Sequence, residues 1–94
     1  MAVPSEKAPE PGPLARAVSA QVKVLMAEHS ITAQDLAKKA GLSRSYLGKR
    51  LRNESSFTVN DIEAICDALD VDLEYFSYEV VRRRKRGKYQ EQQP

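Results

Sequence analysis

A glycine turn between two short amphipathic segments constrains the fold of this chain more than any other feature. Residues 33–40 and 44–52 carry apolar side chains at helical spacing, and only three residues separate them. Gly41 fits the left-handed conformation that commonly ends a helix, and Ser43 can cap the helix that follows. The small side chain of Ala37 allows the two helices to approach closely. The sequence therefore predicts two short helices packed together across a tight turn.

Length and composition place this turn within one small domain. The chain has 94 residues, of which 41% are hydrophobic and 30% are charged, and these values are ordinary for a globular protein. No apolar run is long enough to span a bilayer, and the first residues lack the apolar stretch of a secretory signal. We therefore expect a cytoplasmic protein that does not contact a membrane.

The scarcity of cysteine and histidine excludes several kinds of site. Cys66 is the only cysteine, so an internal disulfide is excluded. His29 is the only histidine, and these two residues are too few for a zinc site with four Cys or His ligands. A domain of this size also leaves little room for a catalytic pocket. We expect no enzyme activity, no metal, no cofactor and no small-molecule ligand.

Helix breakers and caps divide the chain into three regions. Residues 1–13 contain four prolines and are predicted to form a disordered arm. Residues 14–77 contain five helical segments and form the folded domain, with caps expected at Thr32, Ser43, Thr58 and Asp72. Residues 78–94 form a basic C-terminal extension, partly disordered from Gly87 onward, and the pattern over 78–81 is compatible with helix or strand. The expected inner faces carry Leu14, Val18, Val22, Leu25, Met26, Leu36, Ala37, Ala40, Leu47, Leu51, Val59, Ile62, Ile65, Cys66 and Leu69.

The charges are strongly segregated along the chain, although the net charge is only +2. Residues 38–52 contain six basic residues and no acid, whereas residues 53–79 contain eight acids and no base. A second basic cluster places six Lys and Arg residues within positions 82–88. A focused basic stripe on a small domain is typical of proteins that bind a polyanion such as nucleic acid.

The second of the two short helices can present a polar face to a partner. Leu47 and Leu51 lie one turn apart and are expected to face inward. The residues that fall mainly on the opposite side are Arg44, Ser45, Gly48, Lys49 and Arg52. Their side chains include donors for guanine and phosphate, and the major groove, about 12 Å wide, admits a helix. Two helices joined in this way form the helix-turn-helix pattern.

Two stretches resemble the Xre family of helix-turn-helix proteins, also called lambda-repressor-like or Cro-like. The first is Thr32-Ala-Gln-Asp-Leu-Ala-Lys-Lys-Ala-Gly-Leu-Ser-Arg-Ser-Tyr-Leu, and the second runs from Thr58 to Phe76. The resemblance covers about residues 18–76. It implies an all-α, compact five-helix lambda-repressor-like domain whose third helix, residues 44–52, is the recognition helix. It also implies a transcriptional regulator from bacteria or phage, more readily a repressor than an activator.

The resemblance assigns DNA contacts position by position. Arg44 and Ser45 are expected to reach base edges, with Lys49 one turn further on the same face. Four positions depart from the family pattern: Ala33 stands where many relatives carry glutamine, Arg50 where many bury an aliphatic residue, and Ser30 and Asn53 where glycine is common. Arg50 is expected to clamp a phosphate. The predicted DNA-binding residues are Thr32, Gln34, Arg44, Ser45, Tyr46, Lys49, Arg50 and Arg52. Candidate contacts of the C-terminal extension to the DNA backbone are Arg82, Arg83, Arg84, Lys85 and Arg86.

The expected partner is double-stranded DNA, bound by a homodimer on paired half-sites in the nucleoid. Two alternatives remain open at this point. One is a protein-interaction module, such as an antitoxin or a phage accessory factor, whose acidic fourth helix meets an unknown protein partner. The other is a non-specific nucleic-acid binder driven by the basic C-terminal cluster. A specific binder would prefer its site over random duplex by roughly 10³-fold or more.

Overall fold

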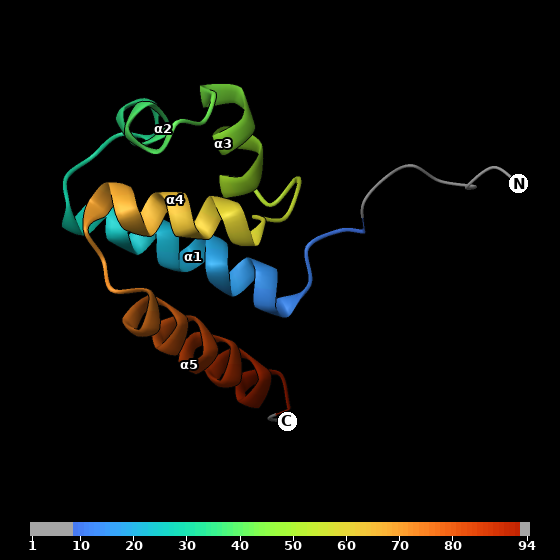
Figure 1. Cartoon of the computed structure of the whole chain (residues 1–94). Coiled ribbons are helices and arrows are strands. Elements are labelled where there is room, and N and C mark those ends of the chain that lie inside the picture. Colours follow the sequence, from blue (N-terminus) through green and yellow to red (C-terminus); the bar gives the residue numbers. More distant parts are fainter. Residues whose placement is uncertain (1–8, 93–94) are drawn as a thin grey trace, which may run out of the picture.

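The computed structural model describes residues 9–92, with side chains placed for residues 9–86, and this part of the chain folds into five α-helices (Figure 1). They are α1 (Pro13–Glu28), α2 (Ala33–Ala40), α3 (Arg44–Leu51), α4 (Val59–Leu69) and α5 (Leu73–Gln92). The described residues contain no strand, so the predicted all-α fold with five helices is confirmed. Within the same range, no helix combines the length and the hydropathy needed to cross a membrane.

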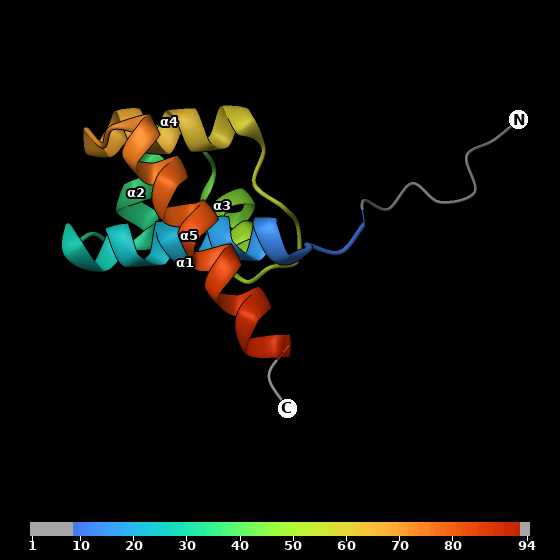
Figure 2. The same ribbon diagram turned by 90° about the horizontal axis from the view of Figure 1, so that it is seen from below.

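The helices enclose the core from four sides. Figures 1 and 2 together show α1 and α4 on opposite flanks, the pair α2–α3 on a third side and α5 on the side opposite that pair. Helix α1 contacts both α3 and α5, whereas α2 contacts α3 and α4. The helix-turn-helix pair and α5 therefore lie on opposite sides of the core.

Each helix contributes one large side chain to the centre of the core. These fully buried residues are Val22, Leu36, Leu47, Ile65 and Phe76, from α1 to α5 in order. Burying a side chain of this size contributes roughly 1.5–3 kcal/mol relative to leaving it exposed. The short helices α2 and α3 thus depend on tertiary packing, because helices of eight residues are not stable alone.

Two apolar residues that the sequence places on inner faces are exposed. Leu14 is 51% exposed and Val59 is 81% exposed. Both belong to the first turn of their helices, α1 and α4, where neighbouring helices cover about half of Leu14 and little of Val59. Helical spacing identifies the face on which a residue lies, but it does not show how far along the helix the neighbouring elements extend.

The predicted caps and turn are confirmed. The amide nitrogen of Asp35 donates to Thr32 Oγ1 at 3.1 Å, and that of Tyr46 donates to Ser43 Oγ at 3.0 Å. Gly41 has φ +75°, a left-handed conformation that costs a residue with a side chain more than it costs glycine. These local interactions fix where α2 ends and α3 begins.

The two ends of the described chain differ from the sequence interpretation. Pro11 is buried, and its carbonyl accepts a hydrogen bond of 3.2 Å from Arg16 Nε, although nothing in the predicted arm was expected to be buried. Residues 1–8 of that arm lie outside the described residues. At the other end α5 continues to Gln92, whereas the sequence leaves residues 78–81 open between helix and strand and predicts partial disorder from Gly87 onward. The buried side chain of Val80 holds this helix on the core directly after the acidic segment 53–79.

Cys66 is a core residue, as its place on the inner face of α4 predicts. Its side chain is buried, and burial together with the nearby Asp67 and Asp72 raises the pKa of its thiol to about 11. The thiol is therefore protonated at neutral pH and is a weak nucleophile, because thiolate is the reactive form.

Candidate nucleic-acid interface

The outer face of α3 brings together three of the predicted base-reading residues. Arg44, Ser45 and Lys49 are all exposed, while Leu47 and Leu51 on the opposite face are buried. Because α3 begins directly after the Gly41 turn, its first residues project from the end of the domain that α2 and α3 form (Figure 1). The outer face thus presents a guanidinium, a hydroxyl and an ammonium group within about two helical turns.

Thr32 and Gln34 lie at the start of α2, and both are exposed. The Thr32 hydroxyl oxygen accepts a backbone hydrogen bond as the cap of α2, whereas the side chain of Gln34 faces solvent. The beginning of a helix carries unpaired N–H groups and the positive end of the helix dipole, so it attracts phosphate. These residues therefore lie where a DNA backbone beside α3 could be bound.

Tyr46 and Arg50, two further predicted DNA-binding residues, are engaged inside the protein. The Tyr46 hydroxyl donates to both carboxylate oxygens of Asp61, at 3.0 Å to Oδ1 and 2.8 Å to Oδ2. The Arg50 guanidinium carbon lies 3.5 Å from the centroid of the Tyr46 ring, and Arg50 Nε is 3.8 Å from Asp61 Oδ2. With 17% of its side chain exposed, Arg50 is held against α4 rather than extended into solvent.

Arg52 follows the end of α3 and forms an exposed ion pair. Its Nε donates to Glu54 Oε2 at 2.7 Å, which raises the pKa of Arg52 and lowers that of Glu54. A Cβ at Gly48 would lie 3.0 Å from Arg52 Nη1, so the missing side chain at Gly48 makes room for the Arg52 guanidinium. The ion pair is exposed, and such pairs contribute little to stability.

The basic C-terminal cluster lies on the other side of the molecule. It belongs to α5, which Figures 1 and 2 place across the core from α2 and α3. Arg82 Nη2 donates to Glu79 Oε1 at 3.0 Å, and Arg83 Nη2 donates to Gln21 Oε1 of α1 at 2.8 Å. The remaining described members, Arg84, Lys85 and Arg86, are exposed. The two groups of predicted DNA contacts are therefore not brought together on one face.

Two residues that the sequence interpretation did not connect to α3 hold this helix in place. Asp61, expected only as part of a helix cap, is the buried acceptor for Tyr46. Ser19 of α1 is also buried, and its hydroxyl donates to the carbonyl oxygen of Leu51 at 3.1 Å. A polar residue among the apolar positions of α1 or α4 is the signal that could have identified them.

Comparisons with known proteins agree with this geometry. A family model described as the Cro/C1-type HTH DNA-binding domain matches residues 21–74. The wild-type restriction-modification controller protein C.Esp1396I is 30% identical, with 74% of this chain and 90% of that chain covered and a TM-score of 0.70. A search of curated protein sequences finds no match.

A second solved structure supports the fold. The clp gene regulator ClgR from Corynebacterium glutamicum is 24% identical, with 88% of this chain and 87% of that chain covered and a TM-score of 0.77. At this identity the likeness shows the fold alone. The family match spans both helices of the turn, α2 and α3, and the whole of α4. The chain therefore belongs to the Cro/C1-type helix-turn-helix family and is a DNA-binding protein of the class that regulates transcription.

Proposed function

We propose that the protein binds a specific double-stranded DNA sequence by placing α3 in the major groove. The observation that carries this proposal is the outer face of α3, where Arg44, Ser45 and Lys49 are exposed together. Arginine and lysine donate to guanine O6 and N7, and a serine hydroxyl can bond several base edges. The first residues of α3 would thus read sequence, as recognition helices do.

Phosphate contacts are assigned to residues around this helix. The start of α2, with Thr32 and Gln34, would bind the backbone on one side of the groove. Arg52 is exposed and can exchange Glu54 for a phosphate, whereas Tyr46 and Arg50 serve mainly to hold α3. The exposed C-terminal residues Arg84–Arg86 face away from α3, so we assign them no contact with the duplex that α3 reads.

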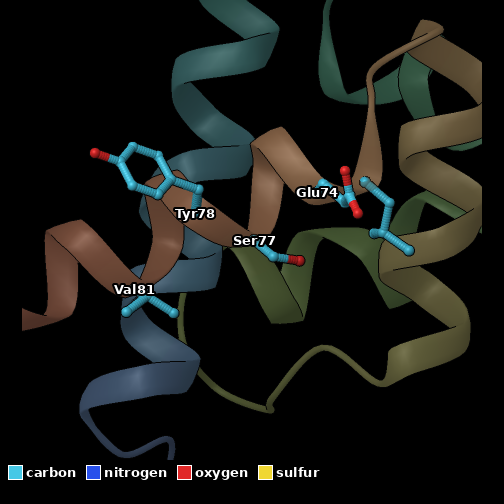
Figure 3. A pocket seen from close by; sticks show the side chains of 5 residues that line it. Glu74, Ser77, Tyr78 and Val81 are labelled. Carbon is cyan, nitrogen blue, oxygen red and sulfur yellow. The ribbon is translucent and has the colours of Figure 1, made fainter.

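We further infer that the protein acts as a homodimer through the outer face of α5. Figure 3 shows a shallow apolar groove on this helix, lined by Leu73, Glu74, Ser77, Tyr78 and Val81. Leu73, Tyr78 and Val81 are large and exposed, and Leu14 of α1 lies near Val81 in an adjoining groove. A second copy, related by a twofold axis, would cover this surface with the same residues.

We expect such a dimer to bind paired half-sites. Twofold symmetry of the protein requires half-sites in a palindromic arrangement, about 34–36 Å apart or a multiple of that distance. The regulator would act in the cytoplasm, as a repressor when its site overlaps a promoter. It would have no catalytic role.

A selection of bound sequences from random duplex pools tests the proposal. We expect a palindromic consensus, bound roughly 10³-fold or more above random duplex. An Arg44→Ala variant carried through the same selection should relax one position in each half-site. If unaltered protein enriches no sequence, the proposal of a specific binder is wrong.

The dimer face has its own test. Val81→Glu would place a carboxylate in the α5 groove, and we expect it to lower the dimer fraction in sedimentation equilibrium. Val59→Glu is the matched control, because Val59 is an exposed valine on a different helix. A dimer that survives Val81→Glu unchanged would place the interface elsewhere.

A further inference from the structure

Asp61 is a buried carboxylate that joins α4 to the recognition helix. Its side chain is only 6% exposed. Besides the two contacts from the Tyr46 hydroxyl, Asp61 Oδ2 accepts a hydrogen bond of 2.9 Å from the backbone nitrogen of Thr58. The positive charge of Arg50 lies beside the same oxygen, with Nε at 3.8 Å. A single carboxylate thus binds the start of α4 and two side chains of α3.

The capping role of Asp61 does not by itself explain why this residue is buried. Asp35 occupies the same position in α2, three residues after the cap Thr32, and it is exposed. Burial of a carboxylate is unfavourable unless hydrogen bonds and a nearby opposite charge compensate. Here Tyr46 and Arg50 supply both, so the burial of Asp61 and the placement of these two α3 residues depend on each other.

Because α3 is short, its contacts with Asp61 can affect how the helix is rotated about its axis. The helix has eight residues, and its inner face packs through only two leucines, Leu47 and Leu51. The hydrogen bond from Ser19 to the Leu51 carbonyl oxygen restrains the end of the helix, and the contacts of Tyr46 and Arg50 with Asp61 add a restraint on one flank. A rotation of about 20° would move an atom at the outer helix radius of roughly 5–6 Å by about 2 Å. That displacement breaks a hydrogen bond of 2.8 Å, the distance between the Tyr46 hydroxyl and Asp61 Oδ2.

Tyr46 and Arg50 are well placed to transmit this restraint. They lie one turn apart on one flank of α3, and the Arg50 guanidinium is stacked on the Tyr46 ring. Arg50 Nη1 also lies 3.5 Å from the Tyr46 carbonyl oxygen. Ser45 precedes Tyr46, and Lys49 precedes Arg50, so a fixed flank determines where the base-reading side chains point.

We propose that Asp61 is a positioning residue for sequence recognition: through Tyr46 and Arg50 it fixes the rotation of α3, and hence the direction of Arg44, Ser45 and Lys49. This inference rests on the proposed DNA-binding role of α3. In this role Asp61 does not contact DNA. It affects sequence specificity only through Tyr46 and Arg50.

Tyr46→Phe removes the hydroxyl donor and leaves the ring beneath Arg50. In the full chain we expect the ratio of affinities for the selected duplex and a random duplex to fall about tenfold, the effect of one buried hydrogen bond to a charged group. Tyr75→Phe is the matched control, because Tyr75 is exposed on α5. It should leave the ratio unchanged.

Asp61→Asn tests the acceptor. The side-chain carbonyl oxygen of asparagine can still accept from the backbone nitrogen of Thr58, so this variant mainly removes the charge beside Tyr46 and Arg50. Asp72→Asn, at the exposed cap of α5, is the control for charge removal. The double variant Tyr46→Phe with Asp61→Asn should lose no more selectivity than the stronger single variant, because both changes break the same connection.

Hydrogen exchange separates this inference from the proposed function. In free protein, Tyr46→Phe should speed exchange of the α3 amides about tenfold, while α5 amides change much less. Unchanged α3 exchange, or equal affinity losses on both duplexes, would overturn the positioning role even if the unaltered protein selects a sequence. If the unaltered protein selects none, the proposed function fails, and the specificity role assigned to Asp61 fails with it.

Discussion

The two basic clusters of the chain, residues 38–52 and 82–88, each contain six Lys and Arg residues, but they lie in different parts of the fold. The first is divided by the Gly41 turn between α2 and α3, so its residues occupy two helices that meet at an angle. The second lies on one continuous helix, α5, across the core from the first. Two clusters with the same number of basic residues therefore need not have the same role in DNA binding.

Each cluster also contains an arginine that belongs to the protein interior. Arg50 is stacked on Tyr46 beside Asp61, and Arg83 is bonded to Gln21, which is itself buried. Such an arginine positions an element, whereas an exposed one such as Arg44 can bind a partner. Membership in a basic cluster therefore says less about the role of an arginine than the contacts of its own side chain.

The largest expected difference between the clusters is in sequence recognition. Arg44→Ala should lower affinity for the selected duplex by about 1–3 kcal/mol and relax preference at one base position. Its affinity for random duplex should change much less, because a base contact is lost rather than a phosphate contact. Titration of both duplexes checks this. Equal losses on the two duplexes would remove α3 from the role of reading bases.

The turn that divides the first cluster should be sensitive to a side chain. Gly41→Val places a branched residue at φ +75°, and we expect a loss of roughly 1–3 kcal/mol in the free energy of unfolding. Denaturant unfolding measures it. Gly48→Ala is the control: its Cβ meets only the flexible end of Arg52, and alanine favours helix, so stability should rise by up to about 1 kcal/mol.

The second cluster should matter more for stability than for DNA binding. Arg83→Ala removes the donor to the buried side chain of Gln21, and we expect a loss of about 1–2 kcal/mol in unfolding free energy. Arg84→Ala, the exposed neighbour, should change it by less than about 0.5 kcal/mol. Similar melting curves for the two variants would show that the bond to α1 contributes nothing.

The smallest effect is expected for Arg84→Ala in DNA binding. Loss of one phosphate contact would change the slope of log affinity against log salt by about 0.9. Because α5 faces away from α3, we expect the slope for the selected duplex to stay the same within error. Titrations at several salt concentrations decide this. A change of the full amount would show that the C-terminal cluster reaches the bound duplex.

The sequence alone determined the local architecture of this protein. The caps at Thr32 and Ser43, the glycine turn and the apolar stripes are set by residues within about four positions of each other, and each can be read without knowing the fold. The exposed face of α3 follows from the same helical spacing. These signals, with the resemblance they support, were sufficient to predict five helices, a recognition helix and DNA as the partner.

How the helices pack determines which charged and polar side chains are exposed and which are bonded inside the protein. The bond between Tyr46 and Asp61 joins residues 15 positions apart, and the bond between Gln21 and Arg83 joins residues 62 apart. Such pairs depend on how whole helices pack, which local spacing does not encode. Packing of Phe76 and Val80 also places α5 across the core from α3. The burial of Asp61 is compensated by the opposite charge of Arg50, which the fold brings beside it, and the same contact holds the side chain of Arg50, a predicted DNA contact, against α4.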